Sequence, residues 1–273
     1  MTTTFDKFIN KFFLEEMNAL EVKDKINEET IAILVFGACE NHGDHMPFGS
    51  DFIFPMKLVE NVIKDILNNK SKLSIQNLKL LVLPAIPYGV SSHHNSFQMT
   101  MSLEASTLIS IIIDLFSSLG KNGIRRILVI NGHDGNISPI EIASRIIKNK
   151  IPDIVIACLE AWWVLVGQKN KGLFDVWNGL GHGGEAETSG MLFARPDLVD
   201  LNNAPNQTIP NLPGEDIRIY WKFDELTNTG ATGSPKKASS EKGEKIVKIL
   251  KETIISFINN MEKSKWNYGI ETK

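Results

Sequence analysis

Acidic and imidazole side chains are concentrated in one short segment, GACENHGDHMPFGSD, which spans residues 37–51. It places five titratable side chains directly after a run of apolar residues: Glu40, His42, Asp44, His45 and Asp51. Buried acids are costly unless a cation or hydrogen-bond donors neutralise them. The segment is therefore either a solvated loop or a place where these groups bind a metal ion.

The remaining histidines also lie in polar, glycine-rich stretches. They occur in SSHHNS (His93 and His94), NGHDGN (His133) and GHGGEAET (His182). The segments that carry His42 and His133 each follow an apolar run of the kind found in buried strands. Ligands bind at the carboxyl ends of the strands in open parallel sheets. Histidines far apart in the sequence are therefore predicted to meet at one site.

A mixed set of imidazoles and carboxylates favours zinc, manganese or iron. With only two cysteines in the chain, a thiolate-rich zinc site is excluded. Glu40 and His42 lie two residues apart, so they point to the same side of an extended chain. Asp51 opens a predicted helix, where its carboxylate either caps the helix or neutralises a cation. An acid shared by two ions is the arrangement of two-metal hydrolases, which activate water and polarise a carbonyl.

Other kinds of site fit these segments less well. NGHDGN follows a predicted strand and could bind phosphate, but no Lys-Ser/Thr follows it, which rejects a P-loop. Ser189 lacks the GxSxG turn of a serine nucleophile. Cys39 lies beside Glu40 and could be a nucleophile, although a small buried hydrophobe is favoured. His45 lies two residues before Pro47 and could simply shape the turn.

An α/β fold with a mainly parallel sheet flanked by helices is predicted, because apolar strand-like runs alternate with helical patterns. The expected strands are 31–35, 78–83, 127–130 and 154–157. The expected helices are 51–68, 103–119, 138–148 and 239–260. Segment 201–235 is rich in Pro and Asn, and we expect a long surface excursion that is functional or at a subunit contact. One domain, residues 1–273, is the simplest partition.

Composition indicates a chain that acts on small molecules. The net charge is −3 with no long basic run, so no nucleic-acid-binding surface is expected. No apolar run is long enough for a membrane span, and the N-terminal residues do not resemble a signal peptide. Cys39 and Cys158 show no disulfide spacing, and we expect both to be buried in a reducing compartment. The predicted location is the cytoplasm.

Four motifs in this order and spacing resemble the creatininase (creatinine amidohydrolase) family. They are GACENHGDHMPFGSD, NGHDGN, HGGEAETSGMLFARPDLVDL and GSPKKASSEKGEKI, and they extend over most of the chain. The resemblance implies a single creatininase-like α/β domain with two divalent metal ions (Zn, Mn or Fe). It also implies hydrolysis of a non-peptide C–N bond and assembly as a homohexamer.

The resemblance assigns roles position by position. Glu40, Asp51 and His133 would hold one ion, and His42 with the bridging Asp51 would hold the other. His182 matches the family's proton-handling histidine, and Glu187 matches an acid close to the metals; both are expected to be catalytic. His94 matches a position that faces the pocket, and it is expected to bind substrate.

Three positions depart from the family pattern. Creatininases have a metal-binding Glu two residues after the histidine of NGH, where this chain has Gly135. Glu185 replaces an apolar residue, so we expect it to supply the missing carboxylate as a metal ligand. Asp134 replaces an aromatic residue that covers the substrate, and it is expected to contact substrate here. These changes make creatinine itself a doubtful substrate.

The sequence therefore predicts a binuclear metal-dependent amidohydrolase that cleaves a cyclic amide or formamide bond of a small molecule. The first alternative is a formylaminopyrimidine nucleotide deformylase. The second is a metal- or ligand-binding relative without catalysis. Trp162, Trp163 and Trp177 could form walls for a flat ring substrate, although such residues more often belong to a core.

Overall fold

The computed structural model describes residues 10–68, 78–211 and 219–269, which are built around a four-stranded parallel sheet. Its strands are β1 (Ile31–Phe36), β2 (Leu80–Val82), β3 (Arg126–Asn131) and β4 (Val155–Leu159), in the order β2-β1-β3-β4. Ile31 of β1 pairs with Leu80 of β2 and with Arg126 of β3. Every residue of β1 is buried, as expected for a strand covered on both faces.

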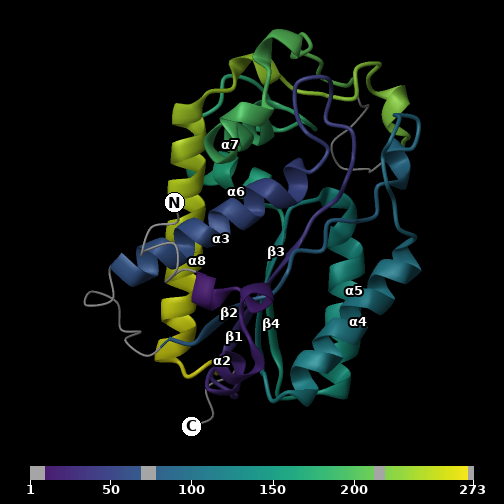
Figure 1. The fold of residues 1–273 in the computed structure, drawn as a ribbon. Helices are drawn as coiled ribbons and strands as arrows, with labels where there is room; N and C mark the ends of the chain where they lie inside the picture. The colour runs from purple at the N-terminus through teal and green to yellow at the C-terminus, as the bar shows by residue number, and fades with distance from the viewer. Residues whose placement is uncertain (1–9, 69–77, 212–218, 270–273) are drawn as a thin grey trace.

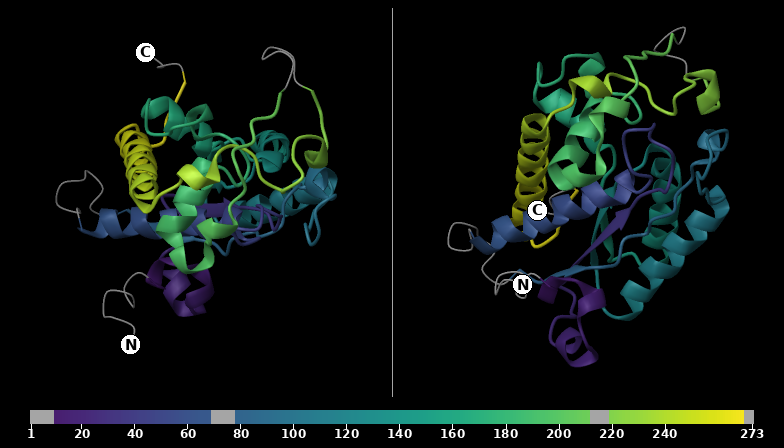
Figure 2. Two further views of the ribbon diagram at one scale, coloured as in Figure 1. Left: turned by 90° about the horizontal axis from the view of Figure 1, so that it is seen from above. Right: turned by 45° about the horizontal axis from the view of Figure 1, so that its top comes forward.

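Helices cover both faces of the sheet (Figures 1 and 2). One layer contains α3 (Ser50–Asn68), α6 (Trp162–Lys169), α7 (Glu185–Ala194) and α8 (Ser240–Lys263). The other contains α4 (Ala105–Lys121) and α5 (Ile137–Lys150), while the short α2 (Ala19–Lys23) precedes the sheet in the chain.

Two hydrophobic clusters result from the alternation of side chains along the strands. Ile31, Ile33 and Val35 of β1 pack with apolar residues of α3 and α8. The intervening residues Ala32, Leu34 and Phe36 pack with those of α4 and α5. The central strands are thus fixed from both sides, and their carboxyl ends are held at one edge of the sheet.

The predicted α/β class and parallel sheet are confirmed, with shifts at the ends of the elements. The expected helix 103–119 begins at Ala105, and the expected helix 138–148 extends over Ile137–Lys150. The helices α2, α6 and α7 were not predicted. In the described part of segment 201–235 the helical turns are all short 3₁₀ helices, which agrees with a surface excursion.

The expectation that both cysteines are buried is wrong. Cys39 is half-buried, and Cys158 is exposed on β4. β4 lies at the edge of the sheet, so its side chains are covered less completely than those of β1 and β3. Within the described ranges, we find no helix with the length and apolar character that crossing a bilayer requires.

The strand order brings the two main motifs together. The chain leaves β1 toward β2 on one side, while β3 lies on the other side of β1. Such a switch in direction creates a crevice at the carboxyl ends of the two central strands. The segments after β1 and β3, which carry Glu40 and His133, therefore begin side by side (Figure 1).

Candidate metal centre

The segment after β1 turns its polar side chains inward. Glu40 is completely buried and His42 almost completely so, and Asp51 lies in the first turn of α3 with 5% exposure. His42 Nε2 is 2.9 Å from Asp51 Oδ1. The same short segment thus delivers two carboxylates and one imidazole to the edge of the sheet.

The segment after β3 adds a second imidazole. His133 Nδ1 lies 3.2 Å from Glu40 Oε1 and 3.2 Å from Asp51 Oδ2. The amide of Asn131 donates to the His133 carbonyl at 2.7 Å, and that of Asn136 donates to the Gly37 carbonyl at 3.0 Å. These two asparagines tie the loop to itself and to the segment after β1.

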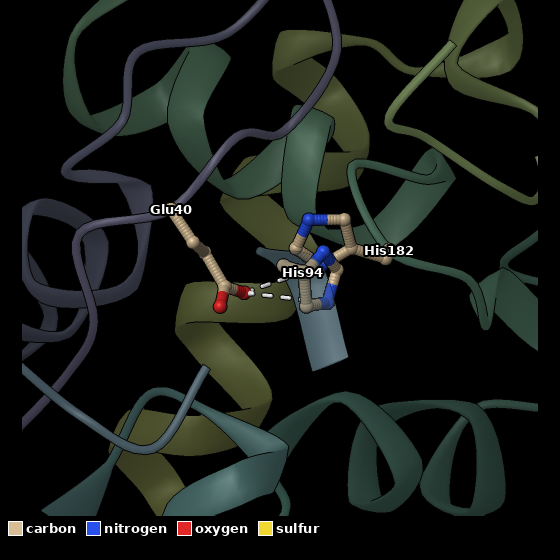
Figure 3. A group of neighbouring side chains, drawn as sticks. All are labelled: Glu40, His94 and His182. Carbon is tan, nitrogen blue, oxygen red and sulfur yellow. Dashed lines mark ion pairs between the residues drawn. The ribbon is translucent and has the colours of Figure 1, made fainter. Parts of the chain in front are cut away.

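A third imidazole comes from the loop before α7. His182 Nδ1 is 3.5 Å from Glu40 Oε1, and His94 Nε2 approaches the same oxygen at 4.0 Å (Figure 3). The His182 ring stacks on His42 with centroids 4.2 Å apart. Glu187, in the first turn of α7, accepts a hydrogen bond from the amide of Gly183 at 2.6 Å.

The three inward-facing imidazoles share one hydrogen-bonding pattern. On the side away from the cluster, each ring has a nitrogen beside a backbone carbonyl: His42 Nδ1 with Glu40 at 3.0 Å, His133 Nε2 with Val90 at 2.9 Å, and His182 Nε2 with Asn41 at 2.6 Å. A carbonyl only accepts, so it places the N–H on that side and leaves the other nitrogen for the cluster. Metal-binding histidines are oriented in this way.

Three carboxylate oxygens of the cluster lack hydrogen-bond partners. Glu40 Oε1 and Oε2 and Asp51 Oδ2 are buried and make no hydrogen bond with the described residues. A buried anionic oxygen without a donor is unfavourable unless a cation neutralises it. Three groups of residues place ligand atoms close enough to share an ion: Glu40, His42 and Asp51; His42, His182 and Glu187; and Glu40, His94 and His182. The residues present fit divalent metal ions.

The proton affinities reflect the same crowding of charge. Burial opposes protonation of His42, but the carboxylates around it, with Asp51 foremost, raise its pKa to about 10. Burial raises the pKa of Glu187 to about 7 and lowers that of His94 to about 3. Burial and the neighbouring His42 and His94 hold the pKa of His182 well below its ordinary value. Without metal, the cluster is stabilised by protons that a cation would displace.

Glu185, which was expected to supply a metal-binding carboxylate, lies apart from the candidate ligands in the structure. Its side chain is buried, and its oxygens accept hydrogen bonds from the ammonium of Lys242 and from the backbone amides of Asp175 and Val176. It belongs to none of the three groups of neighbouring ligand atoms, whereas Glu187 does. Glu185 and Glu187 are two positions apart, so they point to different sides of α7.

The glycine at position 135 is explained by packing. A Cβ atom there would lie 2.0 Å from the Val90 carbonyl oxygen and 2.6 Å from His133 Nε2. A side chain cannot occupy that space while the Val90 carbonyl accepts from His133. The structure therefore has no room for a carboxylate side chain at position 135.

A cavity of about 190 Å³ opens onto the cluster. Glu40, His94, His133, His182 and Glu187 form its polar floor, and Asp134 is an exposed residue in its wall. Its aromatic wall consists of Trp163, Trp177, Trp221 and Phe223. Trp162, in contrast, is buried in the core against Phe54, at a centroid distance of 4.7 Å.

Sequence reasoning missed Trp221 and Phe223. Phe223 is buried, with its ring 4.1 Å from that of His94. Both residues lie in the segment 201–235, and its unusual length was the only signal of a functional role. Cys39 is a poor candidate for a nucleophile, because burial and the neighbouring Glu40 and Asp51 raise the pKa of its thiol.

The parallel sheet and the buried imidazole–carboxylate cluster at its carboxyl edge define an α/β protein with candidate ligands for divalent metal ions. The chain belongs to the creatininase (creatinine amidohydrolase) family, whose model matches residues 15–258. It is thus a hydrolase that acts on carbon–nitrogen amide bonds.

Relatives and solved structures agree with this family. Creatinine amidohydrolase from Pseudomonas putida is 29% identical over 84% of this chain and 89% of its own length. Mycofactocin precursor peptide peptidase from Mycolicibacterium smegmatis is 24% identical over 79% of each chain. A crystal structure of creatininase superposes with a TM-score of 0.78 at 28% identity, covering 91% of this chain and 97% of the other. Similar structures include a manganese creatininase and a zinc–zinc form of a creatininase mutant.

Proposed function

We propose that this chain is a binuclear metal-dependent amidohydrolase that cleaves a cyclic amide or formamide bond of a small, flat molecule. The proposal is carried by one observation. Three imidazoles, each oriented by a backbone carbonyl, face carboxylates without hydrogen-bond partners at the floor of a cavity. This is the arrangement that a pair of divalent ions requires.

The ligands are divided between two ions. Glu40, Asp51 and His133 would hold the first, and His42 and the shared Asp51 would hold the second. Glu187 replaces Glu185 in our assignment as the additional carboxylate, because it lies with His42 and His182. Manganese, zinc and iron all accept such ligands, and the manganese and zinc forms of similar creatininases support the first two.

Bound ions supply the activation of water and the polarisation of the amide oxygen. The chain supplies the proton transfers. His182 lines the cavity with Nδ1 toward Glu40, and its lowered pKa keeps the ring neutral, with a nitrogen lone pair on the side of the cluster. It, or a Glu187 carboxyl that is not bound to metal, delivers a proton to the nitrogen of the cleaved bond. That nitrogen then leaves as a neutral amine.

The cavity wall selects the substrate. Its aromatic rings suit a flat group, and its volume of about 190 Å³ suits a compact one. His94 and Asp134, which both line the cavity, are our candidates for substrate contacts. The described lining residues include three acids and neither Lys nor Arg. Glu40 and Glu187 would be neutralised by the ions, so it is the lack of a basic side chain in this described lining that favours an uncharged substrate over a formylaminopyrimidine nucleotide, which remains the alternative.

Metal analysis separates the hydrolase from a binding protein without catalysis. Elemental analysis of the purified chain is expected to give about two equivalents of divalent metal per chain. A protein that holds no metal, and takes up neither Mn, Zn nor Fe, would instead be a metal-independent binding module.

A matched pair of histidine variants tests the assigned ligands. His133→Ala is expected to lose metal and amidase activity while the fold is kept, because Nδ1 of this ring faces both Glu40 and Asp51. His93→Ala is the control, since His93 lines the cavity but belongs to none of the ligand groups among the described residues. Unchanged metal content in His133→Ala removes His133 from the ligand set.

The substrate can be found by screening the Mn- and Zn-loaded chain against creatinine, small lactams, N-formyl-aminopyrimidines and modified peptides. Turnover of a phosphorylated formamide, but of no compact neutral amide, would favour the alternative. We further propose that the protein is cytoplasmic. We also propose that it assembles as the homohexamer that the family resemblance implies. Light scattering during gel filtration tests the latter.

A further inference from the structure

Glu185 and Lys242 form a buried ion pair outside the groups of candidate metal ligands. Glu185 is completely buried, and Lys242 is mostly so. Lys242 lies in the first turn of α8, and its ammonium donates to Glu185, to Asp175 and, at 2.8 Å, to the carbonyl of Lys237. A buried charge needs such partners, so this pair links α7 and α8 to the loop between α6 and α7.

The same carboxylate fixes the backbone of that loop. The amide of Asp175 donates to Glu185 Oε1 at 3.0 Å, and the amide of Val176 donates to Oε2 at 3.2 Å. These are the backbone amides of the two residues immediately before Trp177. Hydrogen bonds to an ionised acceptor are stronger than neutral ones. The Glu185 carboxylate therefore restrains the backbone at Asp175 and Val176.

The backbone immediately after Val176 has an unfavourable conformation. Trp177 and Asn178 have φ values of 46° and 56°, which non-glycine residues seldom adopt. Such a conformation persists only where surrounding contacts impose it. On the far side, the Asn178 carbonyl oxygen lies so near Gly167 of α6 that an added Cβ would be only 2.7 Å away. The loop is thus held between α6 and the Glu185 carboxylate.

The held segment forms part of the cavity wall. Trp177, Leu180 and Gly181 line the cavity that opens onto the metal centre. Trp177 is 41% exposed, so packing against other residues covers only part of its side chain. The place of this ring therefore depends on the peptide groups of Asp175 and Val176.

We propose that Glu185 and Lys242 are positioning residues that set the place of Trp177 in the cavity wall and thereby the fit of the substrate. The effect on substrate rests on the proposed function, while the effect on the loop does not. Neither residue contacts the reacting atoms. The ion pair acts through the two backbone amides and the tryptophan that follows them.

The main test is the double variant E185M/K242M. Replacing both members of a buried ion pair by apolar residues of similar size commonly preserves the fold, and here it also removes the acceptor of the two amides. K245M is the control for a lysine-to-methionine exchange on the same helix, because Lys245 is exposed there. K242R tests rescue, since it keeps the cation.

Hydrogen exchange measured by mass spectrometry on residues 171–182 is expected to be roughly tenfold faster in E185M/K242M. It should stay at the native rate in K245M and close to it in K242R. Acrylamide quenching of Trp177, obtained as the difference between each protein and its W177F counterpart, should rise in the same order. For any amide that the enzyme hydrolyses, KM should rise more than kcat falls.

Native exchange and native quenching in a folded E185M/K242M protein overturn the proposal. If that variant does not fold, E185Q replaces it, because glutamine keeps the shape of the side chain and weakens only the acceptor. Exchange at the native rate in a folded E185Q then overturns the proposal. Metal content, measured in parallel, is expected to be unchanged in every variant. Its absence in the unmodified chain would refute the proposed function alone.

Discussion

Asp51→Asn tests whether one carboxylate serves two ions. Asparagine keeps the shape of the side chain and removes the charge that faces His42 at 2.9 Å and His133 at 3.2 Å. If Asp51 is shared, its loss weakens both sites, whereas His42→Asn weakens only one. We expect almost no retained metal in Asp51→Asn and about one equivalent in His42→Asn, measured by elemental analysis after gel filtration.

The chelated protein gives a second, energetic readout. Burial disfavours the charged form of His42, yet Asp51, Glu187 and Glu40 together raise its pKa from the ordinary 6.5 to about 10. A pKa difference of this size corresponds to about 4–5 kcal/mol of stabilisation. Because Asp51 is the foremost of the three and is hydrogen-bonded to the ring, we assign it about half, or roughly 2–3 kcal/mol.

The sign of the pH dependence follows from the raised pKa. A group whose pKa is higher in the folded state stabilises that state fully below the unfolded pKa, and the effect is lost as pH rises through the folded value. Asp51→Asn should therefore lower the free energy of unfolding in urea most at pH 6, and the difference should shrink toward pH 10. Metal stoichiometry equal to that of the unmodified chain, or a stability loss independent of pH, would refute the assignment of Asp51.

Two further outcomes follow from local packing and burial. Gly135→Ala should lower the free energy of unfolding by about 2–4 kcal/mol in a thermal melt and also weaken metal binding, because its Cβ would meet the Val90 carbonyl at 2.0 Å. Burial lowers the pKa of His45 to about 4, so the unfolded chain binds a proton more readily than the folded chain between pH 6.5 and 4. The contribution of His45 alone should lower the stability of the chelated protein by about 3 kcal/mol through this window. His45→Gln should lack that loss, and an identical pH profile in urea unfolding would contradict the reasoning.

The sheet and four of its flanking helices could be predicted from the sequence, because the patterns that indicate them involve only neighbouring residues. The apolar run of β1 and the helical stripe of α3 are properties of neighbouring residues, and packing only moved their ends. The short helices α6 and α7 were not predicted, because their sequences combine glycine, tryptophan and acids without a clear apolar stripe. Tertiary contacts, rather than periodicity, make these segments helical.

Only part of the candidate site could be predicted from the sequence. Residues at the ends of β1 and β3 could be placed together, because parallel strands end at one edge. Glu185 could not be placed, because its role depends on Lys242, which lies 57 positions away in the chain. A carboxylate two positions from another on one helix gives no local sign of which one faces the metal. The aromatic wall from Trp221 and Phe223 depends likewise on how a long irregular segment folds back.

The carbonyls that orient the three imidazoles belong to the main chain, at Glu40, Asn41 and Val90. A side-chain exchange at Asn41 or Val90 leaves these oxygens where they are. Mutation can therefore remodel the rim of the cavity while the histidines keep their orientation. This separation gives the scaffold room to acquire new substrates without rebuilding its reactive centre.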